Sequence, residues 1–258
     1  MGAPIVYIVC HAFKPMDELF AFPPKFFVSN PSGINFTNLF QQAAGSTVPF
    51  SRYVFNSLVV TAAVVVLSIM ISTMAAFALS KMKFKLKGPM MEINNLALMF
   101  VATAVVIPRY LTISSIGILD TWFAHILPLI AMPVCLFLIK QFMDQVPDSL
   151  LEAAQLEGAN AFTIYLKIIL PMVKPAIATG AILSFQQVWN NTETSNLFTS
   201  TESIRTLAFY MNTLSGVGTV QGQGMAAAAA LIMFVPNLLL FIVSQSSVMN
   251  TMAHSGLK

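Results

Sequence analysis

Long runs of apolar residues, separated by short polar segments, dominate the chain. A helix needs about 20 apolar residues to cross a bilayer, because each residue adds ~1.5 Å and the hydrocarbon core is ~30 Å thick. Residues 54–79 and 121–139 are uncharged and predict two transmembrane helices. Residues 93–108, 175–192 and 225–247 predict three more, and the first of these is long enough only if the charged groups at both ends reach the interfaces.

The segment 3–13 is also apolar but too short to cross a bilayer alone. A cleaved signal peptide needs a charged start and a small-residue cleavage site, and this segment has neither. Either the chain is truncated or this helix is short, and we count the segment as a first span. The sequence then predicts an all-α, polytopic membrane protein of about six transmembrane helices. Because no linker or internal repeat divides the chain, we expect residues 1–258 to form a single membrane domain.

Composition supports a lipid environment. Apolar residues make up 57% of the chain and charged residues 9%, with a mean hydropathy of +0.77. Soluble domains carry about 25% charged residues. The net charge of +3 is too small for a nucleic-acid-binding protein, and no basic stripe is present. Both cysteines, Cys10 and Cys135, lie in apolar segments, where a thiol is expected to act as a small hydrophobic group.

Lysine positions predict the orientation, since short cytoplasmic loops retain Lys and Arg. Residues 80–88 contain Lys81, Lys83, Lys85 and Lys87, which we interpret as a topology anchor on anionic lipid. With this loop in the cytoplasm, the segment 144–174 and the C-terminus are cytoplasmic as well. Eight of the 13 basic residues then lie inside.

The cytoplasmic segment 144–174 is much longer than a turn between antiparallel helices requires. Pro147 and Asp148 are typical of a first helical turn, and Gly158 is typical of a helix end. A second helix is expected to begin near Asn160, before Pro171 and Pro175 redirect the chain. The segment therefore predicts two short helices at the membrane surface.

The first of these helices has an unusual expected surface. Its predicted face consists of Leu150, Ala153, Ala154 and Glu157. Small alanines allow close approach of a partner backbone, and Glu152 and Glu157 offer charge-assisted hydrogen bonds. This profile is typical of a docking helix. An amphipathic helix resting on lipid head groups fits the shape equally well.

Several function classes are disfavoured by absent motifs. The phosphate-binding pattern G-x-x-x-x-G-K-[ST] does not occur, so the chain is not expected to bind ATP itself. The metalloprotease and serine-hydrolase patterns HExxH and GxSxG are also missing, which argues against an intramembrane enzyme. A gradient-driven secondary transporter stays open as an alternative, although the expected spans lack carboxylates away from their ends.

The cytoplasmic segment resembles the EAA loop of ATP-binding-cassette importer permeases. The family pattern EAA---G---------I-LP is matched by Glu152, Ala153, Ala154, Gly158, Ile168, Leu170 and Pro171. Further segments are similar to the carbohydrate-importing branch, of maltose type and binding-protein-dependent, and cover nearly the whole chain. They are FKPMDELFAFPPKFF, NSL at 56–58, IGILDT at 116–121 and VWNN at 188–191.

The resemblance implies a sugar importer that works by alternating access, driven by a separate ATPase. Implied partners are a pair of ATPase subunits that bind ATP and magnesium, a second and different permease subunit, an extracellular solute-binding protein and membrane lipid. The implied location is the cytoplasmic membrane of a prokaryote. An importer for another solute class stays open as an alternative, because the motif indicates coupling to an ATPase and does not indicate the transported solute. The residues expected to couple to the ATPase are Glu152, Ala153, Ala154, Glu157, Gly158 and Pro171.

Such permeases pair around a central pathway, and one interpretation places a polar cluster on a helix that faces it. Its members are Gln186, Gln187, Trp189, Asn190 and Asn191. Amides hydrogen-bond hydroxyl groups, and an aromatic face stacks on the apolar side of a pyranose. Alternatively, the tryptophan lies in the interfacial belt and the amides join helices to one another.

Overall fold

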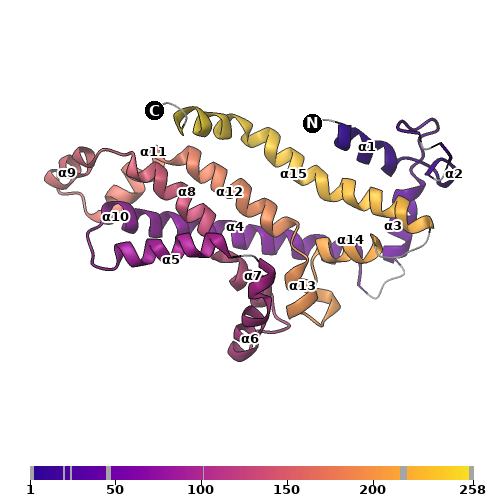
Figure 1. The fold of residues 1–258 in the computed structure, drawn as a ribbon, viewed down its shortest axis with the longest axis horizontal. Coiled ribbons are helices and arrows are strands. Elements are labelled where there is room, and N and C mark those ends of the chain that lie inside the picture. Colours follow the sequence, from indigo (N-terminus) through magenta and orange to yellow (C-terminus); the bar gives the residue numbers. More distant parts are fainter. Residues whose placement is uncertain are drawn as a thin grey trace. The chain divides into compact units, whose positions relative to one another are not determined.

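The computed structural model describes residues 3–19, 21–23, 25–44, 48–100, 102–215 and 220–255, and all regular structure in them is helical (Figure 1). This confirms the predicted all-α class. The α-helices are α1 (Ala3–Ala12), α2 (Met16–Leu19), α3 (Ile34–Ala44), α4 (Phe50–Lys81), α5 (Lys87–Met99), α6 (Val106–Ile116), α7 (Trp122–Ile130), α8 (Pro133–Asp144), α9 (Asp148–Leu156), α10 (Ala161–Ile164), α11 (Leu170–Met172), α12 (Lys174–Trp189), α13 (Glu193–Phe198), α14 (Leu207–Ser215) and α15 (Val220–Ser255). Short 3₁₀ helices cover Ala102–Val105 and Glu202–Ile204, and a π-helix covers Tyr165–Ile169.

The helices pack into two compact units. One comprises Met1–Val60, Leu119–Ala124 and Trp189–Leu239, and the other comprises Thr61–Ile118, His125–Val188 and Leu240–Lys258. The long helices α4 and α15 each run through both units. A single membrane domain stays a prediction.

Two of the described helices are long and apolar enough to cross a bilayer by themselves. They are α4 and the part of α15 over Gly222–Val243. On α4, Val66 is 64% exposed and Met74 is 51% exposed, as expected for side chains that face lipid or another subunit. Two bent helix pairs, α7 with α8 and the chain Ala161–Met172 with α12, pass the same test jointly. The described residues thus contain between two and four candidate spans.

The expected span at 121–139 is bent by 42° between α7 and α8. Proline explains the break. Pro133 begins α8, where its missing N–H is no loss, but its ring disfavours helical geometry at the preceding residue. Met132 accordingly has φ −119° and ψ 91°.

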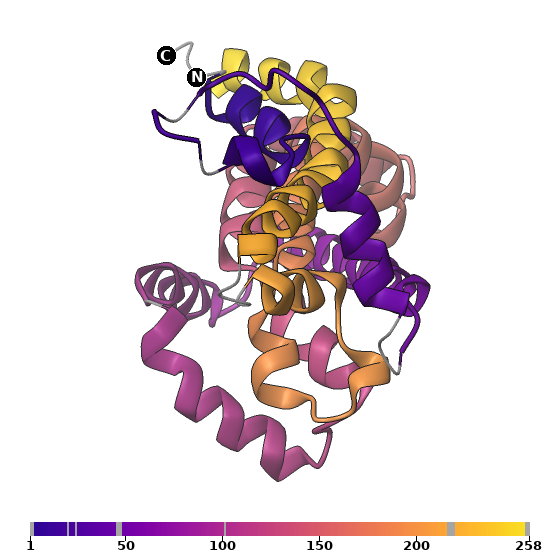
Figure 2. The ribbon, with the colours of Figure 1, turned by 90° about the vertical axis from the view of Figure 1, so that its right-hand side faces the viewer.

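The expected span at 93–108 is not one helix. It is divided among α5, a 3₁₀ turn and α6, and Figure 2 shows α6 leaving α5 at a marked angle. Phe100 has extended backbone angles after α5. The β-branched residues Thr103, Val105 and Val106 favour helix weakly, and Pro108 falls within the first turn of α6, where proline fits best.

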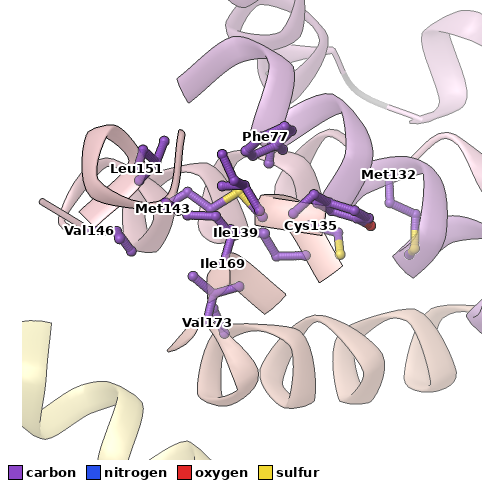
Figure 3. Close-up of a cluster of buried hydrophobic side chains, with 14 residues drawn as sticks. Phe77, Met132, Cys135, Ile139, Met143, Val146, Leu151, Ile169 and Val173 are labelled. Carbon is purple, nitrogen blue, oxygen red and sulfur yellow. The ribbon is translucent and has the colours of Figure 1, made fainter. Parts of the chain in front are cut away.

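A buried apolar cluster supports the loop formed by the segment 144–174 (Figure 3). Ile139 and Met143 of α8 lie at its centre, with Phe77 from α4, Leu151 from α9 and Ile169 from the π-helix. Ile139, Met143 and Ile169 have no exposed surface. The loop is therefore part of a packed core on its inner side.

Candidate functional site

The expected two-helix structure of the segment 144–174 is present as α9 and α10. Pro147 precedes α9 in an extended conformation, and Asp148 occupies the first turn, where a carboxylate interacts favourably with the helix dipole. Gly158 follows α9 with φ +84°, a left-handed conformation that glycine adopts without strain. Asn160 caps α10, because its Oδ1 accepts a hydrogen bond from the Thr163 N–H at 2.8 Å.

The two faces of α9 differ from the expected arrangement at one residue. Leu151 and Ala154 are both 8% exposed and belong to the buried cluster, so Ala154 cannot lie on an outer docking face. These two residues are three apart and share one helical stripe, which turns inward onto the core. A small side chain at 154 lets α9 lie close to that core. Ala154 therefore lies on the inner side of α9, and its coupling role stays a prediction.

The outer face of α9 keeps the predicted residues Ala153 and Glu157 and adds Leu156. Glu152, Ala153 and Glu157 are exposed, and Leu156 has 91% of its surface open. Leu156 offers a partner a hydrophobic contact, and the two carboxylates beside it offer charged hydrogen-bond acceptors. The small side chain of Ala153 leaves room for the partner to approach.

A sharp bend follows the loop. The axis of Ala161–Met172 and that of α12 differ by 79°. Pro171 lies just after the π-helix, and its lack of an N–H removes one backbone hydrogen bond from the turn before it. Tyr165 holds the π-helix to α4, because its hydroxyl is 2.8 Å from Thr73 Oγ1 in a buried contact.

The lysine run does not act as a simple lipid anchor throughout. The side chain of Lys81 is only 5% exposed, and its Nζ is 2.7 Å from Asp148 Oδ1. The hydrogen bond and the positive charge of Lys81 lower the pKa of Asp148, and Lys83 and Lys87 add to this effect. Lys83 and Lys85 are exposed and fit the predicted role. Sequence reasoning missed the bonded role of Lys81 because nothing in the lysine spacing distinguishes it.

The polar segment at 186–191 is divided between the two units. Gln186 and Gln187 are exposed residues near the end of α12 and belong to one unit. Trp189, in the other unit, is 4% exposed, and its Nε1 donates to the Met233 carbonyl at 3.1 Å. This burial favours the alternative in which the tryptophan joins helices. Asn191 Oδ1 accepts from the N–H of Thr194, in the first turn of α13, at 3.0 Å.

Asn190 opens onto a pocket of about 300 Å³ within its unit, which is at the lower end of the size range of small-molecule sites. Thr192 and Asn212 supply the other polar groups of the wall. The remaining lining is Ala208, Met211, Ala226, Ala229, Ala230 and Met233. Asn212 and Thr192 were missed in the sequence, because single polar residues in separate segments carry no motif.

The motif-like segments NSL and IGILDT have structural roles around the chain 198–207. The amide of Asn56 donates to the carbonyls of Ser203 and Arg205 at 2.8 Å each, and Ser57 Oγ accepts from the Leu207 N–H at 2.7 Å. Asp120 Oδ1 accepts from the N–H groups of Ser200 and Thr201 at 2.9 and 2.8 Å. These contacts hold the loop from two sides within one unit.

Comparison with known proteins places these features in a family. Residues 60–247 match the family described as binding-protein-dependent transport system inner membrane component. The probable ABC transporter permease protein YurM of Bacillus subtilis is 31% identical over 99% of this chain and 83% of its own length. The sulfoquinovosyl glycerol transport system permease protein SmoH of Agrobacterium fabrum is 26% identical over 99% and 88%.

A solved structure has the same fold. It is a chain of a bacterial ABC transporter involved in the import of the acidic polysaccharide alginate, with a TM-score of 0.81 at 20% identity over 95% of this chain and 90% of that one. Within the described residues, no cluster of metal-ligating side chains accompanies the loop or the pocket. The match over residues 60–247 covers more than half of the sequence, and the chain belongs to the family of binding-protein-dependent transport system inner membrane components.

Proposed function

We propose that this chain is the membrane-spanning permease subunit of an ATP-driven importer that carries a carbohydrate into the cell. It would contribute about six transmembrane helices and alternate between inward-facing and outward-facing states. Family membership and the apolar helices support this proposal. The segment 144–174 and the C-terminus are then cytoplasmic, in the cytoplasmic membrane of a prokaryote.

The observation that carries the proposal is the outer face of α9. Leu156 is 91% exposed next to Glu152, Ala153 and Glu157, on a helix whose inner side is buried in the core. A helix at rest on lipid would place its apolar stripe toward the membrane, whereas the main apolar stripe of α9, Leu151 and Ala154, is already covered. The open face is therefore available to a protein partner.

That partner is an ATPase subunit, present as a pair in the assembled transporter. The chain lacks a phosphate-binding motif, so ATP and magnesium belong to the ATPase and this chain is not an enzyme. Closure of the ATPase pair would move α9, and the 79° bend at the end of the loop offers a place where the movement changes direction. A different permease subunit completes the pathway, and an extracellular solute-binding protein delivers the solute.

A carbohydrate is the cargo best supported. The relatives include a sulfoquinovosyl glycerol permease and the structural match serves alginate import. The pocket at Asn190 places two amides and a hydroxyl against alanine and methionine side chains. Such a wall suits a sugar, whose hydroxyls need donors and acceptors while its ring carbons are apolar. Gln186 and Gln187 stay candidates for the solute pathway on the ground of their exposure.

Uptake by cells tests the proposal against its alternatives. A strain without this chain and the same strain carrying it are given radiolabelled mono- and oligosaccharides, methionine and putrescine. We expect at least one carbohydrate to accumulate only when the chain is present, and ATP depletion to abolish its accumulation. If only methionine or putrescine accumulated in a chain-dependent way, the substrate would be an amino acid or a polyamine and not a carbohydrate. Accumulation that survives ATP depletion and stops when the ion gradient collapses would indicate a secondary transporter.

A further inference from the structure

The last turn of α4 is bonded to both ends of the connection that precedes α9. Lys81 is the final residue of α4, and its Nζ donates to the Val146 carbonyl at 2.6 Å and to Asp148 Oδ1 at 2.7 Å. Val146 lies in the connection and Asp148 begins α9. One ammonium group thus joins α4 to the chain on which α9 starts.

A second contact fixes the other side of the same connection. Ser80 Oγ donates to Asp144 Oδ1 at 2.6 Å, and Asp144 is the last residue of α8. Lys140 Nζ donates to the other oxygen of Asp144 at 2.6 Å, which orients the carboxylate. Two consecutive residues of α4 therefore bind the two acids that flank 145–147.

The burial of the two partners is unequal. The Lys81 side chain is 5% exposed and that of Asp148 is 77% exposed. Little of the Lys81 side chain reaches water, so a displacement of α9 that left Lys81 behind would remove two partners from an ammonium group that water replaces only in part. Exposed surface pairs have no such constraint.

Apolar contacts lie on the inner side of this polar contact. One buried cluster contains Phe77 of α4, Val146 of the connection and Leu151 of α9. Figure 3 shows Val146 and Leu151 at one end of this cluster. Apolar packing permits sliding, since it has no directional bond. The hydrogen bonds of Lys81 are directional, and they fix the position of α9 along α4.

We propose that Lys81 is a positioning residue that makes α9 and the end of α4 move as one rigid body, so that displacement of the docking helix is passed directly to a membrane-spanning helix. This rests on the proposed function, in which an ATPase displaces α9. Sequence spacing alone does not single out Lys81 from Lys83, Lys85 and Lys87, and its hydrogen bonds to Val146 and Asp148 do.

The test measures the distance between α9 and α4 by spin labels. Labels are placed at Gln155→Cys, at the edge of the outer face of α9, and at Met74→Cys on α4, after replacement of Cys10 and Cys135 by alanine. Both label sites are exposed. The distance is recorded in the transporter assembled with its ATPase, without nucleotide and after trapping with ATP and vanadate, and also in the isolated chain in detergent.

Three variants are compared with the parent. Lys81→Met keeps the length of the side chain and removes its charge, Lys81→Arg keeps the charge, and Lys85→Met removes an exposed lysine of the same run. We expect one narrow distance distribution in the parent, unchanged between the two nucleotide states. We expect Lys81→Met to broaden the distribution and to shift it on trapping, while Lys81→Arg and Lys85→Met behave like the parent.

A second readout follows function. In Lys81→Met we expect the ATPase to remain bound and to hydrolyse ATP, with less solute accumulated per ATP, and Lys81→Arg to restore the parental ratio. A parental distance that changes on trapping, or an unchanged distribution in Lys81→Met, would overturn the proposal. Absence of any bound ATPase in the parent would instead contradict the proposed function, while the distance in the isolated chain would still report on the contact.

Discussion

Asp120 has an unusual backbone conformation, and its carboxylate accepts several hydrogen bonds. Its φ of +58° lies in the left-handed region, which Asp and Asn tolerate better than most residues. This geometry places its carboxylate against the backbone N–H groups of Ser200 and Thr201 and the Thr201 hydroxyl. The bonds to Thr201 and Ser200 lower the pKa of Asp120 from an ordinary 3.8 to about 2.

The lowered pKa predicts a pH dependence for the loop 198–207. A carboxyl whose pKa is depressed by folding stabilises the folded state above its unfolded pKa, and this contribution is lost as pH falls through the folded value. We expect the loop to be protected at neutral pH and to open between pH ~4 and pH ~2. Limited proteolysis by pepsin across that range provides the measurement.

Asp120→Asn serves as the matched variant, because Asn accepts the same backbone angles and carries no charge. It is expected to open the loop at all pH values and to remove the transition. A transition of the same midpoint in this variant would assign the pH dependence to another group.

At the level of helices, the apolar runs predicted well where helices lie along the chain, but they predicted poorly where a helix is interrupted. The run 54–79 corresponds to α4, and Gly158 and Asn160 correctly marked the end of α9 and the start of α10. The breaks at Met132 and Phe100 were missed, since run length alone ignores how Pro133 constrains its neighbour. The inward position of Ala154 was missed as well, because a helical stripe can be assigned to the core only once the core is known.

Gly180 permits the close approach of α12 to α8 within one unit. A Cβ at this position would lie 2.7 Å from Cys135 Sγ and 3.3 Å from Ile69 Cδ1. Cys135 is 1% exposed, so its sulfur has little room to move. The glycine is therefore explained by helix packing and not by backbone conformation.

Gly180→Ala is expected to lower the free energy of unfolding by about 1–3 kcal/mol, as overpacking of a tight contact does. Combination with Cys135→Ala should recover part of this loss, because the second change removes the sulfur that the new methyl group meets. Unfolding in detergent by heat or by titration with a denaturing detergent measures both. Gly88→Ala, which adds a Cβ with nothing within 4 Å, is the control. Equal losses at 88 and 180, or strict additivity with Cys135→Ala, would contradict the packing explanation.

At the scale of the whole molecule, α9 lies between a packed core and an open outer face, as the proposed transport cycle requires. The inner side of α9 belongs to the core that includes α4, α8 and the π-helix, while its outer side is open. The family pattern made the loop predictable from sequence. The pocket at Asn190 was only partly predictable, because Thr192 and Asn212 come from segments far from the recognisable motif.

Binding of the ATPase tests the central claim most directly. The chain is purified in mild detergent from cells that also produce its ATPase, and the molar ratio of ATPase to chain is measured for the parent, Glu152→Lys, Leu156→Glu and the control Asp17→Lys. Asp17 is an exposed acid in α2, so its reversal changes the charge by the same amount outside the loop. We predict a stoichiometric ATPase with the parent and with Asp17→Lys, and its loss with Glu152→Lys and Leu156→Glu. Retention of the ATPase by both α9 variants, or its absence from the parent, would contradict the docking role of this helix.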